Sequence, residues 1–240
     1  MKLRDGSETK DPRCGLIFSG DSPDIPGLFS LPPADGGIDL RKRELINKRR
    51  IRNLGDAPLE QFISSCVGMG FTNMLEHEKG ISSRGSEWAT EFYFEVQRRD
   101  QLPGGEYPGA YPVMGGTSIY DALVYAKEIG LISDFVRART MDEVLSGMCY
   151  HPSGAIFGLD WTEGMMRPDR KGMSRVTGRS VGGHCTYGRD FYLKQGIVRG
   201  PNSWPEWNPW LNGDWAMSTK ELDKALRRGG ECWFACKVEA

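Results

Sequence analysis

The sequence changes character at Pro152, and this change constrains the fold more than any other feature. In residues 38–151 apolar side chains recur every three or four positions, which is typical of amphipathic helices. Residues 152–238 instead contain short runs rich in aromatic and β-branched residues and punctuated by glycine, which favour strands. Helices followed by strands predict an α+β fold with two lobes that meet along a cleft.

The beginning of the chain differs from both halves. Residues 1–37 are rich in Gly, Pro, Ser and Asp and show no sustained hydrophobic period, so we expect an irregular N-terminal arm. The rest, residues 38–238, is predicted to form a single domain that contains both lobes. Within it Ser118, Thr140 and Ser218 each precede an acidic residue by three positions, a pattern that caps helix starts.

The charge balance argues against a nucleic-acid partner. Lys and Arg total 31 and Asp and Glu total 32, so the chain lacks the basic surplus that phosphate binding requires. No segment approaches the roughly 18 consecutive apolar residues of a membrane span, and the N-terminus lacks the apolar centre of a secretory signal. We therefore expect a cytoplasmic protein that does not act at a membrane.

The chain also offers little for a metal or cofactor. Its six cysteines are too sparse for a disulfide scaffold, so most are expected to be buried free thiols. There are three histidines and neither a CxxC nor an HxxxH pair, which leaves no obvious ligand set for a metal. No GxxxxGK[ST] and no strand-linked GxGxxG motif is present, so no cofactor is predicted.

His184 has the surroundings of a functional residue. Two glycines precede it, which lets its strand approach a ligand or another chain segment closely. Asn202 and Trp204 follow 18 and 20 residues later, and two consecutive strands would place Asn202 beside His184. An amide oxygen that accepts one imidazole N–H leaves the other nitrogen free as a base, and Trp204 is expected to shield that bond. The alternative is a structural histidine followed by an ordinary turn.

Cys66 is the candidate nucleophile. It is expected at the first turn of a helix, where the helix dipole favours thiolate over thiol, and a nearby imidazolium would lower its pKa further. Its backbone N–H, free at a helix start, can donate to a developing oxyanion. Either Gln61 or Glu60 could stand near enough to give the second donor, but a carboxylate would repel the oxyanion, which leaves Gln61. A buried core cysteine is the alternative.

In combination, Cys66, His184 and Asn202 resemble the catalytic residues of the papain family of cysteine peptidases. The order Cys, His, Asn and the Ser-Trp after the asparagine are those of the family, with 118 residues from cysteine to histidine and 136 to asparagine. Asp39-Leu40-Arg41, and the Gln61 loop that leads to Ser-Cys, are similar to its compact bacterial and phage-borne branch.

The resemblance covers roughly residues 38–238 and implies a papain-like fold, with a helical left lobe, a β-barrel-like right lobe and the active-site cleft between them. It implies a cysteine peptidase that hydrolyses amide bonds of a peptide or protein substrate through a thioester acyl-enzyme intermediate. Gly115 and Gly116 match the family's glycine pair, which offers backbone hydrogen bonds to an extended substrate. A phage-encoded member would act in the host cytoplasm or in the virion.

Some positions depart from the family pattern. Gln61 stands five residues before Cys66, whereas the family glutamine stands six before, and Phe62 replaces the glycine that follows it. The loop is therefore either one residue shorter or the oxyanion hole is altered. The cysteines of the left-lobe disulfide are absent, which agrees with a reducing compartment. The arm is too short for the family's helical pro-region, so zymogen control of the usual kind is not expected.

Two other functions stay open. The chain could be a catalytically weak or inactive papain-fold protein with a structural or partner-binding role, docking a protein through the N-terminal arm or through the Trp-rich segment 203–215. The simpler interpretation of those tryptophans is that they close the core of the second lobe. A cell-wall amidase of the Cys-His-polar type would use similar chemistry, but its Cys-to-His interval is usually much shorter.

Overall fold

The structure is a computed structural model, and it describes residues 1–19, 25, 27–28, 44–49, 59–77, 84–204 and 206–237. The helices and strands follow one another along the chain as α1 (Cys66–Glu76), α2 (Gly85–Arg99), α3 (Ile119–Glu128), β1 (Ile132–Ala138), α4 (Met141–Tyr150), β2 (Ala155–Thr162), β3 (Ser180–Gly188), β4 (Asp190–Tyr192), β5 (Ile197–Pro201), the 3₁₀-helix η3 (Pro209–Leu211), β6 (Asp214–Ser218), α5 (Thr219–Arg227) and β7 (Glu231–Lys237).

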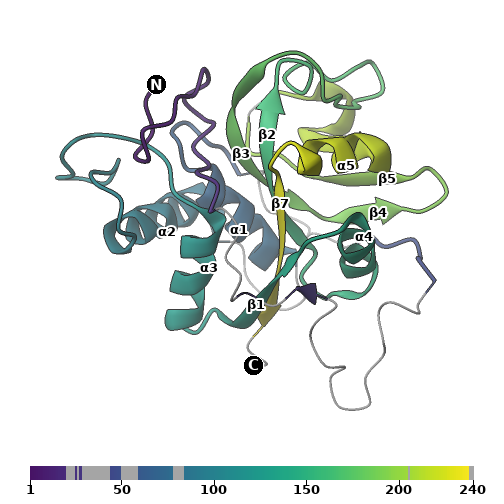
Figure 1. Ribbon diagram of the computed structural model, residues 1–240, viewed down its shortest axis with the longest axis horizontal. Coiled ribbons are helices and arrows are strands. Elements are labelled where there is room, and N and C mark those ends of the chain that lie inside the picture. Colours follow the sequence, from purple (N-terminus) through teal and green to yellow (C-terminus); the bar gives the residue numbers. More distant parts are fainter. Residues whose placement is uncertain are drawn as a thin grey trace.

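The helical left lobe is built around α1, which is buried along its whole length. Its glycines let α2 come very close, since a Cβ added at Gly68 would lie 2.2 Å from the carbonyl oxygen of Ala89. The rings of Phe71 and Phe92 stack across this contact, with their centroids 4.6 Å apart. Helices α1, α2 and α3 gather on one side of the molecule, as Figure 1 shows.

The second lobe consists of two antiparallel sheets. One has the strand order β1-β7-β2-β3 and the other the order β4-β5-β6. The expected α+β class is therefore confirmed. The described strands of the second lobe form two separate sheets rather than a closed barrel, and β7 and β1 extend the first sheet beyond β2. Trp215 and Phe157 pack edge to face between the two sheets, 5.7 Å apart.

The predicted helix caps are present. The side-chain oxygens of Ser118, Thr140 and Ser218 each accept a hydrogen bond from the backbone N–H three residues later, at the starts of α3, α4 and α5. At Thr140 the bond is reciprocated by the carboxylate of Glu143, which completes a capping box. These local signals fix where three of the helices begin.

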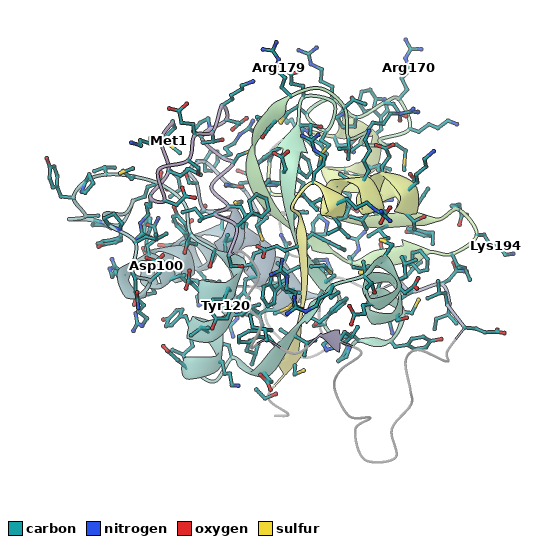
Figure 2. The ribbon with its side chains drawn as sticks, viewed as in Figure 1. Met1, Asp100, Tyr120, Arg170, Arg179 and Lys194 are labelled. Atoms are coloured by element: carbon teal, nitrogen blue, oxygen red, sulfur yellow. The ribbon has the colours of Figure 1, made fainter. Side chains whose placement is uncertain are left out.

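The first part of the chain lies between the two lobes. In Figure 1 the purple N-terminal segment descends between α1 and α3 on one side and β2 and β3 on the other. In Figure 2, Met1 and Asp100 lie on the flank of the molecule that α2 and α3 occupy. The motif at residues 39–41 lies outside the described residues. Among the residues that the structure describes, no helix is both long and apolar enough to cross a membrane.

Candidate active site

Cys66 is the first residue of α1 and has no solvent exposure. The helix packs against β3, which brings the sulfur near the backbone of Cys185, the residue after His184. Burial raises the pKa of the Cys66 thiol to about 11, and the backbone N–H groups of Cys185, Gly15, Val67 and Cys66 partly oppose the rise. With the arm in this position the thiol is neutral at pH 7.

His184 and Asn202 form the predicted pair. The Nε2 atom of His184 lies 2.9 Å from Oδ1 of Asn202. The ring of Trp204 covers the imidazole at a centroid distance of 4.2 Å, and Trp161 meets it edge on at 4.9 Å. Nδ1 of His184 is buried and has no hydrogen-bond partner among the described residues. The asparagine therefore orients the ring, and Nδ1 is the nitrogen left for proton transfer.

The two residues of this pair reach each other from different sheets. His184 is on β3, Asn202 follows β5, and β4 lies between these strands in the sequence. Gly200 makes the approach possible, because a Cβ there would lie 1.9 Å from the carbonyl oxygen of Tyr187 at the end of β3. Only a residue without a side chain lets β5 pass this close, so Gly200 helps to place Asn202 against the imidazole.

The imidazole is also neutral in this arrangement. Burial lowers the pKa of His184 to about 4, and the hydrogen bond to Asn202 offsets only part of that effect. Two charged residues of the arm act on it in opposite directions, since Asp11 raises the pKa and Arg13 lowers it. The thiol of Cys66 and the imidazole of His184 are thus both buried and both neutral at pH 7.

The side chain of Gln61 is held at the same site. Its Oε1 accepts a hydrogen bond from Nε1 of Trp204 at 3.2 Å, which fixes the orientation of the amide. Its Nε2 donates to the carbonyl oxygens of Ile63 and Arg13, each at 2.7 Å. The Nε2 group of Gln61 is thus already engaged by two peptide carbonyl oxygens, one of them in the arm.

The arm fills the cleft between the lobes. On the left-lobe side Ile17 N–H donates to Thr117 O at 2.9 Å and Thr117 N–H donates to Gly15 O at 3.1 Å. On the right-lobe side Leu16 N–H donates to Gly183 O at 3.0 Å. The guanidinium carbon of Arg13 lies 4.7 Å from the centroid of the Trp204 ring. These backbone hydrogen bonds hold the arm in the cleft although it contains no helical pro-region among its described residues.

The backbone of Thr117, and not that of Gly116, is the edge that pairs with the extended arm. The N–H of Gly116 donates to the hydroxyl of Tyr93 at 2.9 Å, and its carbonyl oxygen accepts from Gln97 Nε2 at 3.0 Å. Gly115 forms a β-bridge with Leu3, at the other end of the arm. The assignment of substrate binding to the glycine pair stays a prediction, and Thr117 joins it as a candidate.

The sequence did not predict that the arm lies in the cleft or that His77 is buried. Residues 10–17 have no periodic pattern, although Cys14, Leu16 and Ile17 are buried and the backbone makes hydrogen bonds that any sequence can make. The charged residues around His77 in the sequence are typical of a solvated helix face, but its side chain is buried beside Tyr187, with Nδ1 2.6 Å from Asn73 O.

The Trp-rich segment faces mostly inward. Trp204 and Trp215 are buried, Trp207 packs partly against the same core, and Trp210 is 52% exposed. Beside Asn202 and Trp204 lies an open hollow of about 680 Å³, with Glu60 and Glu206 among its lining residues. Within the described parts of the chain, no group of three or more His, Cys, Asp or Glu side chains could hold a metal ion.

Comparison with known proteins supports the same architecture. No protein-family model matches the chain, and no curated protein sequence matches it. Xylellain, a cysteine protease from Xylella fastidiosa, superposes with a TM-score of 0.69 over 97% of this chain and 99% of its own, at 13% sequence identity. Procathepsin L2 from the larval midgut of Tenebrio molitor gives a TM-score of 0.56 over 93% of this chain and 78% of its own, also at 13% identity. The chain therefore has the papain-like α+β fold of these cysteine proteases.

Proposed function

We propose that the chain is a cysteine peptidase whose catalytic residues are Cys66, His184 and Asn202. The observation that carries the proposal is the bond between Nε2 of His184 and Oδ1 of Asn202 beneath Trp204, which leaves the buried Nδ1 available. The backbone N–H of Cys185, the residue that follows His184 on β3, acts on the Cys66 thiol. Nucleophile, base and orienting amide thus share one site.

The reaction follows from these positions. When substrate replaces the arm, the Cys66 proton passes to His184 and the sulfur attacks the substrate carbonyl carbon. The backbone N–H of Cys66 and Nε2 of Gln61 stabilise the oxyanion. The C–N bond breaks as His184 protonates the leaving amine, which gives a thioester. Water then attacks the thioester while His184 accepts its proton, and the Cys66 sulfur leaves.

With residues 10–17 in the cleft, the peptidase is proposed to be latent. The carbonyl of Arg13 occupies the amide donor of Gln61, and Gly15 contacts the Cys66 sulfur. The carbonyl group of a substrate must reach both the amide donor of Gln61 and the sulfur of Cys66 in order to react. Activity is therefore expected only after residues 10–17 leave the cleft.

The cellular setting is proposed on the same basis. All six cysteines are free, which fits the reducing interior of a cell. We place the protein in a cytoplasm, that of the host if it is phage-encoded, or else in the virion, and keep the compact bacterial or phage branch as its proposed origin.

The test is turnover of a mixed library of internally quenched peptides by protein whose arm has been displaced. Cys66→Ala should abolish cleavage, whereas Cys185→Ser, a matched change at the neighbouring buried thiol, should leave most of it. His184→Ala should lose activity as well. Equal cleavage by the wild-type and Cys66→Ala proteins would refute the assignment.

The alternative, a papain-fold protein that binds partners without turnover, is favoured by one observation. The cleft is already filled by the chain's own residues 10–17, with the oxyanion donor occupied. If displacement of the arm yields a protein that binds peptides but cleaves none, this alternative holds and the peptidase proposal fails.

A further inference from the structure

Arg4, at the tip of the arm, is bound in a socket away from the catalytic residues. Its side chain has no solvent exposure, and its two terminal nitrogens each lie 2.7 Å from a different carboxylate oxygen of Asp100. The same guanidinium donates to the carbonyl oxygens of Gln97 at 3.1 Å, of Pro103 at 3.3 Å and of Leu102. Such bidentate, fully enclosed pairing is the geometry of guanidinium recognition.

The left lobe builds this socket without help from the arm. Asp100 caps the C-terminal end of α2, and its carboxylate also accepts bonds from Leu102 N–H and from the Thr117 hydroxyl, both at 3.0 Å. Gln97 is held by Tyr93 and by the N–H of Glu106. A carboxylate fixed in this way would be buried without a counter-ion if Arg4 left, which is strongly unfavourable.

Within residues 1–17 the arm has two separate attachments, and farther along Ile25 and Leu28 are also buried against the body. Residues 1–9 form a small hairpin, in which Leu3 N–H bonds Ser7 O and Thr9 N–H bonds Met1 O, each at 2.8 Å, and this hairpin carries Arg4 into the socket. Residues 10–17 make the cleft contacts described above. The cleft part contains the catalytic contacts, whereas the hairpin part contains the buried ion pair.

We infer that the socket around Asp100 is an arginine-binding site for the arm, and that it keeps residues 1–17 bound after the chain between arm and body is cut. A cut alone then gives a two-chain protein with its cleft still covered, and release of the arm requires that Arg4 leave the socket. The inhibitory consequence rests on the proposed peptidase function; the binding does not.

The experiment uses the full chain with a recognition sequence for a specific protease placed within residues 20–24, so that the buried Ile25 and Leu28 stay with the body. After complete cutting, gel filtration and mass spectrometry show whether the N-terminal fragment stays with the body. We expect retention in the otherwise unchanged protein and in Lys2→Ala, an exposed control on the same hairpin. We expect loss of the fragment in Arg4→Ala and partial loss in Arg4→Lys, which keeps the charge but not the bidentate bonds.

A second measurement guards against misfolding of Arg4→Ala. A synthetic peptide of residues 1–19 is titrated into the cut Arg4→Ala body from which the fragment has been removed. We expect the wild-type peptide to bind about 100-fold or more tightly than the same peptide with Arg4→Ala, as loss of a buried ion pair implies. A body that binds the wild-type peptide is folded.

Retention of the fragment in Arg4→Ala, loss of the wild-type fragment on cutting, equal affinity of the two peptides, or binding of neither would each overturn the inference. None of these readouts requires catalysis. If the arm fragment and the synthetic peptide bind as expected but no library peptide is cleaved, the arginine-binding site is supported and only the peptidase proposal is refuted.

Discussion

Substitution of Gly15 by alanine tests whether the arm keeps the nucleophile inactive. Gly15 is where the arm passes closest to α1, and a Cβ there would lie 2.1 Å from the carbonyl oxygen and 2.4 Å from the Cβ of Ser64. Backbone atoms cannot retreat by the distance that this overlap demands. Gly15→Ala should therefore expel residues 10–17 from the cleft while the left-lobe hairpin and both lobes stay folded.

The expected size of the effect follows from the pKa of Cys66. Burial raises that pKa from an ordinary 9.0 to about 11. If exposure restores the ordinary value, the thiolate fraction at pH 7 rises about 100-fold, equivalent to roughly 3 kcal/mol. An imidazolium at His184 would lower the pKa further, so about 100-fold is the lower bound expected for the rate of alkylation.

The assay is the rate of iodoacetamide labelling at pH 7, followed cysteine by cysteine with peptide mass spectrometry. The three buried cysteines outside the arm, Cys149, Cys185 and Cys232, serve as internal references, and Lys2→Ala serves as the control variant. The double variant Gly15→Ala with His184→Ala should lack the part of the rise in labelling rate that comes from a pair between the Cys66 thiolate and the His184 imidazolium. The reasoning is refuted if Gly15→Ala labels Cys66 at the wild-type rate, or if labelling rises equally at all buried cysteines.

Three further outcomes are expected. Asn202→Ala, in a protein with the arm displaced, should lower kcat about 100-fold because the imidazole loses its orientation; a steady-state assay that finds unchanged kcat would contradict this role. The pKa of His184 is lowered from 6.5 to about 4 in the folded chain, so its contribution to stability is complete above pH 6.5 and is lost as the pH falls toward 4. This loss amounts to at most about 3 kcal/mol, and His184→Gln should flatten that limb in urea unfolding curves recorded from pH 7 to 4. Gly68→Ala should lower the free energy of unfolding by about 1–3 kcal/mol through overlap with Ala89, against a helix-propensity gain of about 1 kcal/mol; a more stable protein would show that α2 moves aside.

The sequence predicted what depends on local signals. The caps at Ser118, Thr140 and Ser218 lie within one turn of the helices they start, so the spacing of the residues was sufficient. The proximity of His184 and Asn202 was expected from their residue types and the short interval between them. The expected arrangement was two consecutive strands, whereas in the structure the two residues come from separate sheets.

Long-range pairing was harder to predict. Strand β1 has an irregular burial pattern, and it is a strand because β7, about a hundred residues away, pairs with it from Ile132 to Ala138. The protonation state of Cys66 was also missed. The sequence suggested a lowered pKa at the helix start, but it did not indicate that complete burial would raise the pKa instead.

The pair of glycines before His184 links latency to substrate entry. A Cβ at Gly182 would lie 2.2 Å from the Thr9 hydroxyl oxygen, and one at Gly183 would lie 2.4 Å from Leu16 O. A mutation that adds a side chain at either position would evict the arm and, by the same bulk, narrow the entrance for any other polypeptide. A substitution at Gly182 or Gly183 that weakens binding of the arm would therefore also restrict which substrates can enter. In the proposed peptidase, changes that adjust the inhibition are expected in the arm itself.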